Sequence, residues 1–164
     1  MVVYDTTVLL HLAKLTLLEK SCAYFQQVVI PRAVLHEALA GKAHGYPDAV
    51  LVEALVEANT LKVNTVHERA LLARAGAVNI QRGEAEALAL YWQEHADYLA
   101  TDDDNVRKKR VVLSISLIGT PAILVALYQA RLIETSKLHE SVAELRKIGW
   151  FSQAVIDQLL REAP

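Results

Sequence analysis

Short apolar runs alternate with longer segments of helical spacing along most of the chain. The apolar runs predict strands, at residues 2–4, 28–30, 61–63, 98–101 and 111–118. Apolar residues at helical spacing predict helices, at residues 6–13, 32–39, 48–58, 68–74, 84–94, 105–109, 121–130, 136–148 and 152–161. Strands that alternate with helices are typical of an α/β domain, whose mainly parallel sheet is covered by helices on both faces.

The composition supports one folded globular domain. Of the 164 residues, 53 % are apolar and 22 % are charged, which excludes disordered and low-complexity classes. The formal net charge is −2, from 17 basic and 19 acidic residues, so the surface as a whole is not polycationic. Nucleic-acid binding stays possible, because it depends on local clusters of basic residues more than on their sum.

The sequence also gives an expectation for the compartment. Cys22 is the one cysteine, so an internal disulfide is impossible; we expect a reducing compartment and a small buried side chain at this position. Asp5 interrupts the apolar start of the chain and no basic segment precedes it, which is not typical of a signal peptide. The longest apolar stretches are shorter than the roughly 20 residues of a membrane span. We therefore expect a cytoplasmic protein with no membrane partner.

Acidic residues fall where an α/β sheet binds its ligands. Such sheets bind ligands beyond the carboxyl ends of their strands. Asp5 directly follows the first predicted strand, and Asp102 follows the strand that ends at Thr101. Glu37 lies on the helix after the second strand, and Glu84 opens the helix before the Asp102 strand. Four carboxylates from distant parts of the sequence are thus expected to converge at one edge of the sheet.

Clustered carboxylates favour a bound cation, because like charges repel and raise one another's pKa. All-oxygen ligation selects Mg²⁺ or Mn²⁺, which complete their shell with water and phosphate. Such a cluster is what the hydrolysis of a phosphodiester needs. Each acid also has an ordinary alternative: Asp5 and Asp102 as turn or helix caps, Glu84 as a favourable charge at a helix N-terminus, and Glu37 as a solvated helix residue.

The order of these segments resembles the PIN-domain ribonucleases, and in particular the VapC-like toxin branch with an extended C-terminal helical hairpin. The segments that carry the resemblance are DTTVL at 5–9, VVIP at 28–31 followed by Glu37, GEAEALAL at 83–90, ADYLATDD at 96–103 and IGT at 118–120. The resemblance covers nearly the whole chain. It implies a three-layer αβα domain over residues 1–164, in which residues 135–164 form a C-terminal helical extension.

The resemblance also implies an activity and the residues that carry it. The family cuts single-stranded RNA, tRNA included, with Mg²⁺ or Mn²⁺ held by a set of acids. In this chain those acids fall on Asp5, Glu37, Glu84 and Asp102.

Further positions of the family pattern are less sharply defined. The hydroxyl partner that fixes Asp5 by a hydrogen bond falls on Thr7, and Asp103 is a possible helper to the fourth acid as a metal ligand. Glu86 is an alternative to Glu84 as the third acid, although the spacing favours Glu84. The third acid is a glutamate where many members have aspartate, and the extra methylene is expected to shift one metal site.

A basic run and several apolar helices suggest binding partners. The run consists of Arg107, Lys108, Lys109 and Arg110. Directly after the acidic segment, it is placed to hold an RNA backbone, or to balance the preceding aspartates as a solvated helix end. The apolar helices at 50–58 and 118–128 favour a homodimer. By resemblance, the expected protein partner is a small antitoxin that occludes the acidic site.

Two rival functions differ in what they require. A receiver-like phosphoacceptor domain needs a lysine at the end of a late strand, and residues 111–118 contain none. A catalytically inactive PIN-like module, which binds RNA or protein without cutting, stays open because the four acids argue against it without excluding it.

Overall fold

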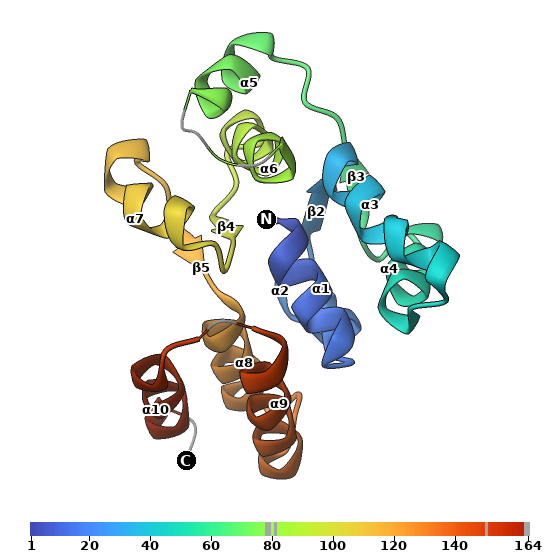
Figure 1. The fold of residues 1–164 in the computed structure, drawn as a ribbon, viewed down its shortest axis with the longest axis vertical. Coiled ribbons are helices and arrows are strands. Elements are labelled where there is room, and N and C mark those ends of the chain that lie inside the picture. Colours follow the sequence, from blue (N-terminus) through green and yellow to red (C-terminus); the bar gives the residue numbers. More distant parts are fainter. Residues whose placement is uncertain (78–79, 81, 150, 163–164) are drawn as a thin grey trace.

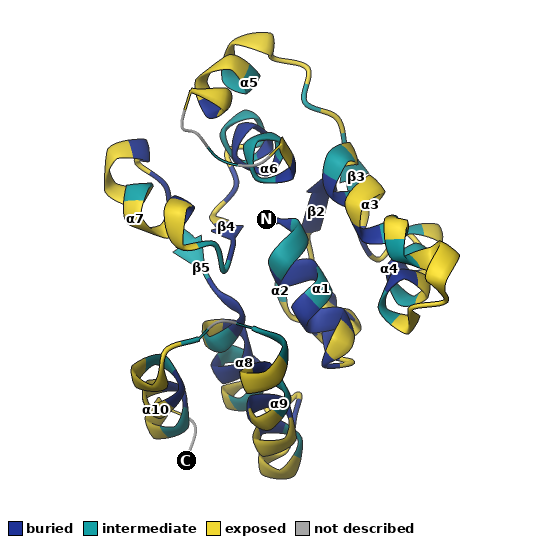
Figure 2. Cartoon of the chain, viewed as in Figure 1, coloured by how far each residue is buried: buried dark blue, intermediate teal, exposed yellow. Residues whose placement is uncertain are grey.

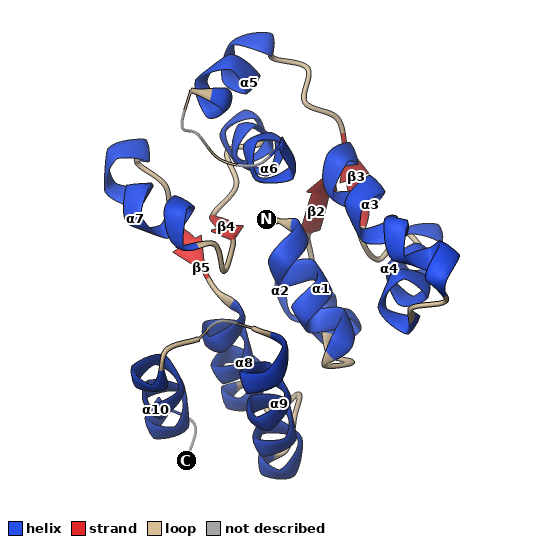
Figure 3. Cartoon of the chain, viewed as in Figure 1, coloured by secondary structure: helices blue, strands red, loops and turns tan. Residues whose placement is uncertain are grey.

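The computed structural model describes residues 1–77, 80, 82–149 and 151–162. Within them five strands form one sheet, in which every pairing is parallel and the order is β3-β2-β1-β4-β5. Figure 3 shows β2, β3, β4 and β5 of this sheet in red among the helices. The strands are β1 (Val2–Tyr4), β2 (Val28–Pro31), β3 (Lys62–Asn64), β4 (Tyr98–Ala100) and β5 (Leu117–Ile118). The predicted parallel α/β sheet is therefore confirmed.

Helices surround this sheet (Figure 1). They are α1 (Thr6–Lys14), α2 (Leu18–Phe25), α3 (Arg32–Leu39), the 3₁₀ helix η1 (Ala40–His44), α4 (Pro47–Glu57), α5 (Arg69–Gly76), α6 (Arg82–Gln93), α7 (Asp104–Leu113), α8 (Thr120–Gln129), α9 (Thr135–Ile148) and α10 (Gln153–Glu162). None of the helices in the described ranges is long and apolar enough to cross a membrane.

Both faces of the sheet are covered. All residues of β1 and β2 are buried, and Figure 2 shows β2 in dark blue. Successive side chains of a strand point to opposite faces. Tyr4 points toward α2, where its hydroxyl pairs with that of Ser21, while α6 packs against β1, β2 and β4. Cys22 is buried in the core, as expected. The result is the three-layer α/β arrangement predicted from the sequence.

The order in which strands are added to the sheet changes side between β1 and β4. The chain builds β2 and β3 on one side of β1 and then crosses to add β4 and β5 on the other side. The N–H of Asp5 donates to the carbonyl of Ala100 (3.0 Å), so the carboxyl ends of β1 and β4 lie side by side. Such a switch point is where open α/β sheets bind ligands.

The helices near the C-terminus stand beside this edge. α8 packs against α1, α2, α9 and α10, and the three C-terminal helices form the lower group in Figure 1. Leu138, Leu145 and Ile156 are buried in their contacts. The C-terminal segment therefore lies within reach of the site that follows β1 and β4.

The predicted strand at 111–118 is wrong over most of its length. Residues 111–113 continue α7, and β5 begins only at Leu117. Val111 and Val112 are 78 % and 85 % exposed. A helix that is already nucleated extends at little cost, so a short β-branched run does not stop it. The helix ends instead at Ser114, which adopts a left-handed conformation (φ 53°).

Three local details concern the starts and connections of helices. Asp5 caps α1, the ordinary alternative considered for this acid, and Thr6 and Thr7 lie inside the helix. The connection between α3 and α4 contains η1. Asp48 lies in the first turn of α4, and Tyr46 occupies the cap position.

Candidate active site

Asp5 is a buried acid with one open oxygen. Its Oδ1 accepts a hydrogen bond from the Val8 N–H (2.8 Å), and its Oδ2 is buried without a hydrogen-bond partner among the described residues. Burial, with smaller contributions from the charges of Asp102 and Glu84, raises the pKa of Asp5 to about 7. Hydrogen bonds from the Thr101 hydroxyl and the Val8 N–H oppose this rise in pKa. Asp5 thus changes charge near neutral pH at the switch point of the sheet.

Asp102 is held on both carboxylate oxygens. Its Oδ1 accepts from the Thr120 N–H (2.8 Å), and its Oδ2 accepts from the Thr120 hydroxyl. His11 Nδ1 lies 2.9 Å from the same Oδ2, so this nitrogen carries the proton when Asp102 is ionised. A Cβ on Gly119 would stand 2.9 Å from Oδ1, so the residue before α8 has to be glycine for this close approach. The Phe151 ring packs against His11, with ring centroids 5.7 Å apart.

Glu37 lies against the first turn of α6. Its Oε2 accepts a hydrogen bond from the Thr6 hydroxyl. A Cβ on Gly83 would lie 2.5 and 2.6 Å from its two carboxylate oxygens, a separation that real atoms do not adopt. The absent side chain at Gly83 therefore admits the carboxylate to the positive end of the α6 dipole.

Glu84 and Glu37 share a cavity. The cavity has a volume of about 260 Å³, and α1 forms one of its walls. Lys14 is the cation of that wall, and His11 belongs to it as well. The lining residues are Thr6, Thr7, Leu10, His11, Lys14, Glu37 and Glu84. Because His11 also contacts Asp102, one side chain connects this cavity to the fourth acid.

The contacts of Thr7 and Asp103 differ from those that the family pattern implies. Thr7 lines the Glu37–Glu84 cavity, while Asp5 receives its short-range hydrogen bond from the Val8 N–H. Asp103 caps α7, because its Oδ1 accepts from the N–H groups of Asn105 (2.8 Å) and Val106 (2.9 Å).

Glu84 and Glu86 face different neighbours. Glu84 lines the cavity beside Glu37. Glu86 Oε2 accepts a hydrogen bond from the Ala33 N–H at the start of α3 (3.1 Å), and its Oε1 lies 3.6 Å from Arg82 Nε. Glu86 thus joins α6 to α3, and Glu84 is the one of the two that lines the cavity beside Glu37.

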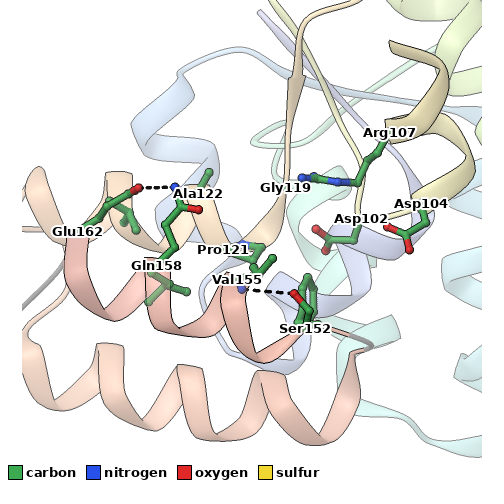
Figure 4. Close-up of a pocket in the computed structure, with 13 residues that line it drawn as sticks. Asp102, Asp104, Arg107, Gly119, Pro121, Ala122, Ser152, Val155, Gln158 and Glu162 are labelled. Atoms are coloured by element: carbon green, nitrogen blue, oxygen red, sulfur yellow. Dashed lines mark hydrogen bonds between the residues drawn. The ribbon is translucent and has the colours of Figure 1, made fainter. Parts of the chain in front are cut away.

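The basic run lies on α7. Arg107 lines a second cavity together with Asp102 and Asp104 (Figure 4). Lys108 and Arg110 are exposed and do not line that cavity, and neither does Lys109. Among the four cations of the run, Arg107 is therefore the one placed beside an acid of the site.

The acids approach one another without forming a ready-made metal cluster. No group of three or more His, Cys, Asp or Glu side chains within residues 1–77, 80, 82–149 and 151–162 is placed to hold a metal ion. Asp102 is turned to Thr120 and His11, and Glu37 is turned to Thr6, so each carboxylate has its own protein contacts.

A family model described as a PIN domain matches residues 1–164, the full length of the chain. This chain is a PIN-domain protein. PIN domains are generally nucleases, so the chain that carries this acidic edge has a nuclease-type fold. No curated protein and no solved structure matches the chain.

In this PIN domain, several residues of the acidic edge were not found from the sequence. They are His11, Lys14, Gly83 and Thr120. A signal for the first two exists, because residues 7, 10, 11 and 14 share one face of the helix that follows Asp5. A signal for Thr120 exists too, since it follows β5, whose carboxyl end lies beside that of β4. Gly83 had no such signal, because only the fold shows that Glu37 approaches it.

Proposed function

We propose that the chain is a metal-dependent endoribonuclease that hydrolyses phosphodiester bonds of single-stranded RNA. The observation that carries this proposal is the buried, unpartnered Oδ2 of Asp5, at the switch point of the sheet and within the field of Asp102 and Glu84. An unpaired buried carboxylate oxygen is costly unless a donor or a cation satisfies it.

The donor set suits a hard divalent cation. Mg²⁺ and Mn²⁺ prefer oxygen ligands, and PIN domains typically use divalent metal ions. In the proposal, Asp5, Glu37, Glu84 and Asp102 hold Mg²⁺ or Mn²⁺. Asp103 is the weaker candidate, because one of its oxygens already caps α7.

The side chains around these acids fix their geometry. The Val8 N–H orients Asp5, and Thr120 together with His11 orients Asp102. When bound, the ion supplies stabilisation of the charge on the phosphate and lowers the pKa of water. An ionised carboxylate of the set orients the attacking water, and Thr7 on the cavity wall is placed to contact it.

Cations of the chain then position the RNA. Arg107 stands beside Asp102 at the rim of the second cavity and contacts the phosphate next to the cleaved bond. Lys108, Lys109 and Arg110 continue along α7 and attract the RNA backbone through their charge. The whole-chain charge of −2 limits non-specific binding elsewhere.

The biological setting of the proposal follows the VapC-like resemblance. The chain acts as the toxin of a toxin–antitoxin pair in the cytoplasm, its targets are single-stranded RNA or tRNA, and an antitoxin occludes the acidic edge. A homodimer is supported by the exposed Val111 and Val112 on α7, because exposed apolar side chains favour an interface.

A catalytically inactive PIN module that binds RNA or protein is the second candidate. It is favoured by one observation, that no three potential ligands in the described part of the chain are placed around a common metal position. Such a module would bind RNA and leave it intact at every metal concentration.

The test is RNA cleavage with a matched pair of variants. A labelled single-stranded RNA is incubated with wild type, Asp5→Asn and Glu57→Gln, with Mn²⁺ and with Mn²⁺ plus chelator. Glu57 is an exposed acid at the end of α4 and serves as the control. We expect chelator-sensitive cleavage by wild type and Glu57→Gln, and none by Asp5→Asn. Equal cleavage by Asp5→Asn, or cleavage that survives the chelator, contradicts the proposal. Binding without cleavage by wild type supports the inactive module.

A further inference from the structure

The second cavity, of about 310 Å³, opens beside Asp102 and is closed on its other side by α10 (Figure 4). This volume is at the lower end of the roughly 300–1,000 Å³ that is usual for small-molecule sites. The cavity is thus of a size to take one flat ring system rather than a folded segment of protein.

One wall of the cavity is apolar. It is built from α8, α10 and Phe151, which precedes α10. A flat aromatic ligand gains from contact with such a wall on its face, while its edges remain free for polar contacts. The apolar side chains are Pro121, Val125, Phe151, Val155 and Leu159.

The charged part of the lining contains more carboxylates than cations. The carboxylates belong to Asp102, Asp104 and Glu162, and Arg107 is the cation of the lining. Asp102 already accepts from Thr120, and Glu162 Oε1 accepts from the Gln158 amide (2.7 Å), so Asp104 and the second oxygen of Glu162 supply the further acceptors. An acceptor-rich lining selects a ligand whose edge carries N–H donors. Among nucleobases, the exocyclic amino groups of cytosine, adenine and guanine provide such donors, and carboxylates are known acceptors for the amino group of cytosine.

The cavity shares its rim with the acidic edge. Asp102 Oδ1 and Arg107 Nη1 lie 2.9 and 3.0 Å from the point where a Cβ on Gly119 would stand, so an acid of the site and a cation converge there. Because Asp102 and Arg107 also line the cavity, a nucleotide whose phosphate is held at this rim would have its base beside the cavity. The base and the phosphate can therefore be bound together.

We propose that this cavity binds the base next to the cleaved phosphate of the RNA substrate and prefers a base with an exocyclic amino group. The inference rests on the proposed function, because Asp102 belongs to both sites. In this proposal α10 sets the preference for the RNA base, whereas the acids of the acidic edge carry out cleavage.

The experiment uses the full chain without metal, so that no turnover is needed. Methyl NMR signals of Val125 and Val155 are followed during titration with cytidine monophosphate and, separately, uridine monophosphate, up to about 10 mM. The cavity is filled in two variants, Val155→Trp on α10 and Ala122→Trp on α8. Ala154→Trp, at an exposed position on α10 outside the lining, is the matched control. The variant Ala122→Trp replaces an exposed residue, so it keeps the test valid if Val155→Trp does not fold.

We expect cytidine monophosphate to shift both methyl signals and uridine monophosphate to bind about fivefold more weakly, the effect of about one hydrogen bond. Filling the cavity is expected to abolish the shifts, and Ala154→Trp to retain them. Equal binding of the two nucleotides, or no shift with either, overturns the proposal. Shifts from acetylated arginine amide in place of the nucleotides identify a protein side chain as the occupant and overturn it as well. A failure of RNA cleavage in the metal-loaded protein would refute the nuclease proposal without changing this binding result.

Discussion

The four acids form two pairs that are held in different ways. Asp5 and Asp102 follow β1 and β4, and backbone N–H groups of Val8 and Thr120 fix them within 2.8 Å. Glu37 and Glu84 lie on α3 and α6 and line an open cavity. The fixed contact described for Glu37 is a single hydroxyl, that of Thr6.

This difference shows what the sheet determines and what the helices add. A backbone N–H is placed by the fold, so the strand-end acids are positioned before any ligand arrives. The helix acids are on longer side chains with more rotatable bonds, so they can adjust to an ion or a phosphate. We therefore expect the strand-end pair to control the chemistry and the helix pair to tune it.

After the loss of cleavage expected for Asp5→Asn, the largest effect is expected from Asp102→Asn. The variant keeps the shape of the side chain but removes a charge worth several kcal/mol to the transition state, so kcat/KM for a labelled RNA with Mn²⁺ is expected to fall about 10³-fold. Glu37→Gln is expected to cost only about 10- to 100-fold, since its carboxylate is the more adaptable. An equal or larger loss with Glu37→Gln would refute the distinction between the pairs.

The next effect concerns the support of Asp102. His11→Leu removes the Nδ1–H that faces Asp102 Oδ2, and losses of a ligand's hydrogen-bond partner are typically 10- to 100-fold in metal affinity. His11→Asn carries an N–H at about the same position and is expected to restore most of that loss. The readout is the Mn²⁺ concentration at half-maximal binding, followed by calorimetry, beside kcat at saturating Mn²⁺. If the two variants behave alike, His11 only fills space.

A third effect is on stability. Burial raises the pKa of Asp5 from 3.8 to about 7 in the folded chain. Between these values the folded chain binds a proton that the unfolded chain has lost, so the metal-free protein loses stability as the pH rises through this window. Asp5→Asn keeps an acceptor for the Val8 N–H and has no proton to lose. Its free energy of unfolding relative to wild type is expected to rise by roughly 2 kcal/mol between pH 5 and pH 8, in urea titrations with chelator. If the difference in free energy of unfolding between Asp5→Asn and wild type did not change with pH, the raised pKa of Asp5 in the folded chain would be contradicted.

The smallest effect is expected from Gly83→Ala. The new Cβ meets the flexible end of Glu37 and displaces its carboxylate, while alanine favours the helix by up to about 1 kcal/mol over glycine. Cleavage is therefore expected to fall only about threefold to tenfold, since 1 kcal/mol corresponds to a factor of roughly five, and thermal stability is expected to hold or rise. Gly76→Ala, where a Cβ meets nothing within 4 Å, is the control in α5. A stability loss in Gly83→Ala without a change in activity would show that Glu37 has no part in the reaction.

Much of the fold was predictable because the strands of a parallel sheet are short apolar runs that local patterns reveal. The strand-end rule then placed Asp5 and Asp102, and the fold confirms that β1 and β4 are neighbours. The error at 111–118 has a local cause, since a β-branched run that follows a capped, charged helix extends it. Local propensity did not distinguish the two outcomes.

The supporting contacts of the site could not be predicted in the same way. His11 and Asp102 are 91 positions apart in the sequence, and their contact depends on how α1 meets the end of β4. The approach of Glu37 to Gly83 likewise depends on the packing of α3 against α6. Such contacts follow from tertiary packing, which the period of apolar residues does not encode.

The most direct test of the account is calorimetric titration of Mn²⁺ into wild type, Asp5→Asn and the control Glu57→Gln at pH 8. The account predicts that wild type and Glu57→Gln bind Mn²⁺ with the same affinity, and that Asp5→Asn loses binding by about 100-fold or more, because the buried oxygen of Asp5 is the central ligand. Mn²⁺ binding of equal affinity in Asp5→Asn and wild type would contradict it.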